Sequence, residues 1–137
     1  PKRVLLVGMG TGAMARYLLP RLPDARFDLV EVDAAVPPLA RRFFGLPVDA
    51  RLKVHVADGR RFIEGVRSRY DLIFQDASFG AEPPAHLSTV EYVGALARHL
   101  GPDGVVVANL AAPALNPRLH AMVSTYRAVF AQVSVFP

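Results

Sequence analysis

The segment V-L-L-V-G-M-G-T-G, residues 4–12, decides the fold of this chain. Val4–Val7 is a continuous apolar run, which is typical of a strand buried on both faces of a parallel sheet. Three glycines follow within five residues. The next apolar residues recur at the spacing of one helix face: Ala15, Leu18, Leu19 and Leu22. The segment therefore predicts a strand, a glycine loop and a helix that Pro20 should kink or shorten.

The rest of the sequence repeats this alternation of strand and helix. Five further strands are predicted: Phe27–Val32, Leu52–Ala57, Tyr70–Gln75, Val105–Asn109 and Gln132–Phe136. Between them, Pro37 or Pro38 can open a helix that Gly45 closes, and Arg60–Val66 forms a short one. Strands that alternate with helices require right-handed crossovers and a parallel sheet. We predict one α/β domain, residues 1–137, a three-layer Rossmann-like sandwich with helices on both faces of a mostly parallel sheet.

Local sequence signals also predict a turn and two helices in the second half of the chain. Ser88 and Glu91 have capping-box spacing and predict a helix behind them. Gly101–Gly104 predicts a turn before the fifth strand. A last helical stripe consists of Leu119, Met122, Val123, Tyr126 and Phe130.

Composition excludes several classes of protein. The chain has 137 residues, a formal net charge of +4 and no cysteine, so it has no disulfide and no thiolate zinc site. The four histidines lack metal-ligand spacing, so we expect no metal. The apolar runs are only strand-sized, so we expect no membrane span. Arginine is scattered, which argues against a nucleic-acid partner. Without a targeting signal the expected location is the cytoplasm, and a homodimer remains open.

The loops after the predicted strands are the expected binding site, because ligands of such folds lie at the carboxyl ends of the strands. The first of these loops supplies Gly8, Gly10, Thr11 and Gly12, whose backbone can approach a ligand closely. Gly8, Gly10 and Ala13 also satisfy a dinucleotide fingerprint, so the loop alone does not choose the ligand.

Carboxylates lie at the carboxyl ends of the second and third predicted strands. Glu31 and Asp33 point to the same side, and either could accept hydrogen bonds from ribose hydroxyls; we favour Glu31. Asp58 could accept from the exocyclic amine of adenine, with Gly59 leaving room for the ring. Asp58 could equally cap the helix that follows, and both roles are compatible.

Asp76 follows the fourth predicted strand and is the candidate catalytic residue. An acid at this place can bind or deprotonate an attacking nucleophile. His86, in the irregular stretch after Asp76, is a weaker candidate for a base, because loop histidines are more often surface residues. These residues predict a ligand that contains adenosine.

Several segments in order carry a family resemblance: V-E-V-D (residues 30–33), V-A-D-G-R-R-F-I (56–63), Y-D-L-I-F-Q-D-A-S (70–78), L-S-T-V-E-Y (87–92) and L-G-P-D-G-V (100–105). Across nearly the whole chain the sequence resembles the spermidine synthase-like family, the polyamine aminopropyltransferases, within the class I methyltransferase fold. The resemblance implies a transferase that moves an aminopropyl group from decarboxylated S-adenosylmethionine to a small amine. It also implies that Glu31 binds ribose, Asp58 binds adenine and Asp76 orients or deprotonates the amine.

Two positions depart from the family pattern. Thr11 stands where the glycine loop of the family usually has an acid, and Gly-x-Gly-Thr-Gly is the ordinary methyltransferase form. Phe79 stands where the family has a second acid, which argues against a dicationic diamine as acceptor. The alternatives are therefore a methyltransferase acting on another small acceptor and a non-catalytic nucleoside-binding homologue. An NAD-dependent oxidoreductase would account for the glycine loop but not for Asp58 or for residues 70–78.

The resemblance also predicts that this sequence is part of a longer chain. The amino-terminal β-domain of the family is not in it. Class I methyltransferase-like sheets usually insert an antiparallel strand between the fifth and sixth strands, and no such strand is predicted before Pro137. We therefore expect an exposed sheet edge or a gap beside the fifth strand.

Overall fold

The apolar runs of the sequence form a single five-stranded parallel sheet. The computed structural model describes residues 1–78, 83–111 and 117–136. The strands lie in the order β3-β2-β1-β4-β5, and all four pairings are parallel. Their bounds are β1 (Arg3–Val7), β2 (Arg26–Glu31), β3 (Leu52–Val56), β4 (Tyr70–Gln75) and β5 (Leu100–Ala108). The predicted first four strands are confirmed, with β1 at the centre of the sheet.

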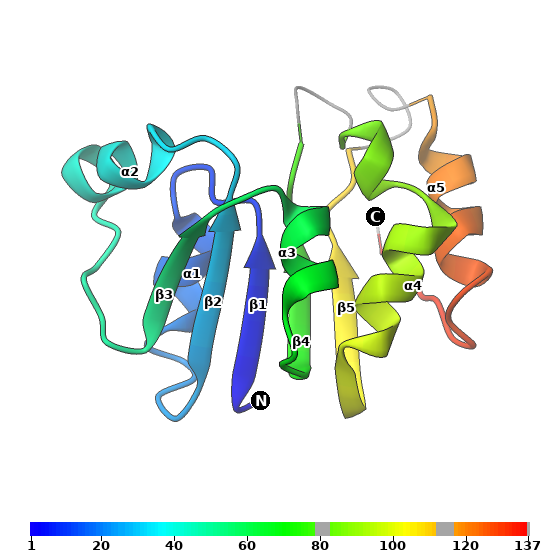
Figure 1. Ribbon diagram of the computed structural model, residues 1–137, viewed down its shortest axis with the longest axis horizontal. Helices are drawn as coiled ribbons and strands as arrows, with labels where there is room; N and C mark the ends of the chain where they lie inside the picture. Colours follow the sequence, from blue (N-terminus) through cyan, green and yellow to red (C-terminus); the bar gives the residue numbers. More distant parts are fainter. Residues whose placement is uncertain (79–82, 112–116, 137) are drawn as a thin grey trace.

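Helices cover both faces of the sheet, which confirms the three-layer architecture (Figure 1). Alternate residues of β1 belong to different cores: Leu5 and Val7 pack with Ile63, Tyr92 and Leu96 on one face. Val4 and Leu6 pack with the first two helices on the other. The helices are α1 (Ala13–Leu18), α2 (Val36–Phe44), α3 (Gly59–Gly65), α4 (Val90–Arg98) and α5 (Leu119–Arg127), with a 3₁₀ turn η1 (Ala85–Leu87).

The predicted helix boundaries follow local chemistry. The first helix ends two residues before Pro20, which cannot continue it. Pro37 and Pro38 lie in the first turn of α2, and Gly45 closes that helix at φ 67°. The predicted capping residue of α4 was wrong by one position. Thr89, not Ser88, accepts a hydrogen bond from the Tyr92 backbone N–H, because both hydroxyl residues suit a helix start and only Thr89 is adjacent to it.

Two predictions about the last strands were wrong. Gly101–Gly104 is not a turn before β5 but an irregularity inside it, because Leu100 already pairs with Tyr70 before Val105 pairs with Leu72. Gln132–Phe136 alternates like a strand but forms none. Within the described residues β5 pairs only with β4, so in that part of the chain its outer edge has no strand beside it, as expected. Val105 and Val107, on one face of β5, are 54% and 39% exposed.

Candidate functional site

The strand order brings the predicted site residues to one edge of the sheet. Because β2, β1, β4 and β5 are neighbours and parallel, their carboxyl ends form a row. Backbone hydrogen bonds continue the pairing past the strand ends: Gly8 N–H donates to the Val30 carbonyl, and Asp76 N–H donates to the Val7 carbonyl. The glycine loop therefore lies between Glu31 on one side and Asp76 on the other.

The glycine loop is closely packed on one side and open on the other. Gly8 has φ 92°, and a Cβ there would lie 2.6 Å from the Asp76 carbonyl oxygen, so only glycine fits between these two backbones. Gly10 also has positive φ, but nothing lies within 4 Å of its Cβ position. Thr11 is exposed beside it, and Gly12 is buried at the start of α1. The open side, at Gly10 and Thr11, is where a ligand can approach the loop.

Glu31 and Asp33 have different partners. Glu31 accepts hydrogen bonds from the backbone N–H of Met9 at 3.1 Å and of Asp33 at 2.9 Å, one at each carboxylate oxygen. Asp33 accepts from the backbone N–H of Ala35 at 2.8 Å and turns the chain toward α2. Glu31 therefore lies against the glycine loop, whereas Asp33 lies at the turn beyond it. An ionised carboxylate has about four acceptor sites, so Glu31 retains capacity for a ligand.

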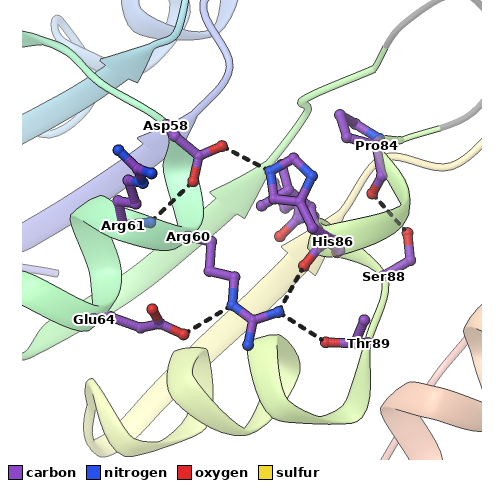
Figure 2. A network of polar contacts seen from close by, with 10 residues as sticks. Asp58, Arg60, Arg61, Glu64, Pro84, His86, Ser88 and Thr89 are labelled. Atoms are coloured by element: carbon purple, nitrogen blue, oxygen red, sulfur yellow. Dashed lines mark hydrogen bonds and ion pairs between the residues drawn. The ribbon is translucent and has the colours of Figure 1, made fainter.

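Asp58 caps α3 and meets a histidine from a distant part of the chain (Figure 2). Its Oδ1 accepts from the Arg61 backbone N–H at 3.0 Å, and its Oδ2 lies 2.7 Å from His86 Nε2. Partial burial acts to raise the pKa of Asp58, but the Arg61 N–H and His86 together outweigh it and hold the pKa below its ordinary value. The capping role is thus present, and the carboxylate is ionised at neutral pH.

Gly59 is needed for packing. A Cβ at this position would lie 2.7 Å from the Val7 side chain, and Leu87 is also near. The close approach of α3 to β1 therefore explains this glycine, whereas the sequence predicts that Gly59 leaves room for an adenine ring. A role of Gly59 at a ligand stays a prediction.

Asp76 has a partner that sequence reasoning missed. The Asn109 side-chain N–H donates to Asp76 Oδ1 at 2.8 Å, and the Asn109 backbone N–H donates to the Gln75 carbonyl. Both side chains belong to exposed residues. Asn109 follows β5 just as Asp76 follows β4, so extending the strand-end rule to the fifth strand would have found it.

Two hollows lie elsewhere on the molecule and contain none of the predicted site residues. One, of about 530 Å³, is lined by Pro1, Lys2, Asp71, Leu72, Asp103 and Val105. The other, of about 460 Å³, is lined by Arg3, Arg26, Phe27, Asp28, Ala50, Arg51 and Lys53. Both lie toward the amino ends of the strands. The candidate site is therefore defined by its row of polar groups at the carboxyl edge.

The described part of the chain offers neither a metal-binding cluster nor a membrane-spanning helix. In those ranges no three or more histidine, aspartate or glutamate side chains gather as a metal-binding group. None of the helices in the same ranges has the length and apolar character needed to cross a bilayer.

The chain matches a family of known proteins in sequence and in fold. The spermine/spermidine synthase domain matches residues 1–136. The chain is 34% identical over 136 residues to a polyamine aminopropyltransferase of Vibrio vulnificus, which covers 96% of this chain and 44% of that protein. Spermidine synthase from Thermotoga maritima superposes with a TM-score of 0.86 at 28% identity, over 96% of this chain and 46% of the other.

A methyltransferase-like protein has nearly the same structure. Human methyltransferase-like protein 13, solved in complex with SAH, superposes with a TM-score of 0.83 at 28% identity, over 96% of this chain and 64% of the other. The chain spans less than half the length of the aminopropyltransferases that it matches. The domain match over residues 1–136, together with these likenesses, shows that the chain belongs to the spermine/spermidine synthase family and has the class I methyltransferase-like fold.

Proposed function

We propose that this chain is the nucleoside-binding domain of a transferase that takes S-adenosylmethionine or its decarboxylated form as cosubstrate, with aminopropyl transfer to a small amine as the reaction. The observation that carries the proposal is the row formed by Glu31, the glycine loop and Asp76 at the carboxyl edge of the sheet. Membership of the spermine/spermidine synthase family supports it. A cytoplasmic location and a homodimer remain predictions.

The residues present fit an adenosine group. Gly10 leaves open space at its Cβ position, so a ligand can reach the loop backbone and the start of α1. Glu31 is held against the same loop through Met9 N–H and keeps acceptor sites for the two ribose hydroxyls. Asp58, ionised and 28% exposed at its side chain, can accept from the adenine amine.

Asp76 is the residue proposed to act on the amine. When bound, the cosubstrate supplies a carbon beside a sulfonium, so that a new C–N bond forms as the C–S bond breaks and its electron pair goes to sulfur. The Asp76 carboxylate orients the attacking nitrogen and accepts the proton that the nitrogen loses. Asn109 holds Asp76 Oδ1 at 2.8 Å and leaves Oδ2 for the amine. Alignment of the partners is the main contribution of the protein.

The acceptor is proposed to be smaller or less charged than a diamine. Putrescine carries two positive charges, and its pocket needs more than one acid. Phe79, which replaces the second acid of the family pattern, lies outside the described residues, so this argument rests on the sequence. The test offers putrescine and decarboxylated S-adenosylmethionine to the protein and follows methylthioadenosine release. Turnover near the ordinary enzyme median of about 10 per second would refute the restriction on the acceptor.

Methyl transfer is the second candidate function. It is favoured by Thr11 in the glycine loop and by the likeness to methyltransferase-like protein 13. Calorimetric titration with S-adenosylmethionine, its decarboxylated form and methylthioadenosine separates the candidates. Preference for the decarboxylated form supports aminopropyl transfer, and preference for S-adenosylmethionine supports methyl transfer. Binding of nucleosides without turnover of any amine supports a non-catalytic homologue, and absence of binding refutes the proposal.

A further inference from the structure

His86 and Asp58 come from different parts of the chain and meet beside the candidate site (Figure 2). Asp58 follows β3, whereas His86 lies in η1, 28 residues later. The distance from His86 Nε2 to Asp58 Oδ2 is 2.7 Å, and the two side chains are 49% and 28% exposed. The pair is therefore open to solvent and within reach of a ligand that approaches Asp58.

The turn that carries His86 is anchored on three sides. The guanidinium of Arg60, itself bonded to Glu64, lies 3.4 Å from the His86 carbonyl oxygen (Figure 2). The side chain of Leu87 is buried in the core. The buried Gln75 side chain donates to the Leu87 carbonyl at 3.1 Å. The backbone of His86 is thus fixed relative to α3 and β4, and the imidazole meets Asp58 from a defined position.

The ionised state of Asp58 determines which of the two groups donates the hydrogen bond. An ionised carboxylate only accepts hydrogen bonds, so Nε2 of His86 must carry the hydrogen, whether the imidazole is neutral or charged. Asp58 is held at Oδ1 by the Arg61 N–H and at Oδ2 by His86. A carboxylate held at both oxygens has lost its freedom to rotate, yet each oxygen keeps one further acceptor site.

We propose that His86 is a positioning residue of the nucleoside site, which holds the Asp58 carboxylate in the orientation that accepts a hydrogen bond from the adenine amine. This inference rests on the proposed function, in which Asp58 receives that amine. His86 acts through Asp58 and takes no part in the transfer itself. The contact supplies a preorganised acceptor, so binding does not have to order the carboxylate.

The arrangement makes nucleoside affinity depend on pH. A proton on His86 places a positive charge beside the carboxylate that the amine hydrogen approaches, which weakens that hydrogen bond. Protonation of the imidazole should therefore lower the affinity for the nucleoside. The other ionisable groups near the pair come from α3 and α4: Arg60, Arg61, Glu64, Glu91 and Tyr92.

The experiment measures methylthioadenosine binding by calorimetry for the wild type, His86→Ala and His86→Gln. Glutamine keeps an N–H donor and cannot gain a charge. His86→Ala should weaken binding about three- to tenfold, the effect expected for one partly exposed hydrogen bond to a charged group, and His86→Gln should restore most of it. His120→Ala, which removes an exposed imidazole from α5, is the matched control and should bind as the wild type does.

The pH profile separates positioning from a purely structural role. As the pH is lowered, the affinity of the wild type should fall, whereas that of His86→Gln, which cannot gain a charge, should stay level. Equal or tighter binding by His86→Ala would overturn the inference, as would a loss that glutamine does not restore or a profile shared by wild type and His86→Gln. A wild-type protein that fails to bind methylthioadenosine would refute the proposed function, and the inference with it.

Discussion

Replacing Gly8 by alanine tests the geometry on which the site depends. The new Cβ would lie 2.6 Å from the Asp76 carbonyl oxygen and 2.8 Å from the Ala77 backbone nitrogen, at φ 92°. An L-residue in left-handed conformations costs about 1–2 kcal/mol, and overpacking against a backbone that cannot rotate away costs about 1–3 kcal/mol more. We therefore expect the free energy of unfolding to fall by about 2–5 kcal/mol.

Gly10→Ala is the matched control for this change. Gly10 also has positive φ, 49°, but its Cβ position has nothing within 4 Å, so only the conformational cost of about 1–2 kcal/mol applies. Urea unfolding with linear extrapolation measures both variants. An equal loss of stability in Gly8→Ala and Gly10→Ala would refute the close approach between the glycine loop and Asp76.

Three further predictions concern Glu31, Tyr92 and Asp58. Glu31→Ala should weaken methylthioadenosine binding by about 1–3 kcal/mol while Asp33→Ala changes it little, and the reverse order in calorimetry would give the ribose to Asp33. Tyr92→Phe should raise the free energy of unfolding by about 1 kcal/mol, because its buried hydroxyl has no hydrogen-bond partner within the described ranges; a loss of stability in urea would reveal a bound partner. Because folding lowers the pKa of Asp58, its carboxylate stabilises the fold above pH 3.8, its pKa in the unfolded chain, and this stabilisation is lost as the pH falls through the folded pKa. Asp58→Asn should therefore flatten the fall in Tm below about pH 4. Parallel melting profiles of the variant and the wild type would contradict this.

The sequence predicted the structure correctly where a residue type or pattern has a single common structural role. Val4–Val7 is apolar without interruption, and a strand buried on both faces explains such a run. Gly45 after a helical pattern and Pro20 inside one mark boundaries by simple stereochemistry. The positions of Glu31 and Asp76 at one edge of the sheet follow from the strand-end rule, which depends only on the order of the elements, and their roles at a ligand stay predictions.

The wrong or missing predictions concern features that depend on which distant segments of the chain meet. Gln132–Phe136 alternates correctly, but a strand exists only where a neighbour pairs with it, and alternation cannot supply the neighbour. Gly101–Gly104 has turn chemistry, yet Leu100 pairs with Tyr70 before it and draws the segment into β5. The contacts of His86 with Asp58 and of Asn109 with Asp76 join residues 28 and 33 positions apart, and one sequence without its fold does not show which distant side chains meet.

The central place of β1 in the sheet has a consequence for how the protein is made. The first strand of the chain pairs with β2 and also with β4, which begins at Tyr70. The hydrogen bond from Asp76 N–H to Val7 and the one from Gly8 N–H to Val30 flank the glycine loop. Residue 76 must therefore be synthesised before both of these hydrogen bonds can form. Pairing of β1 with β4 joins distant parts of the chain, and such contacts slow folding. Amide exchange within β1 should consequently report opening of the whole sheet, because local fraying does not free a strand that is paired on both sides.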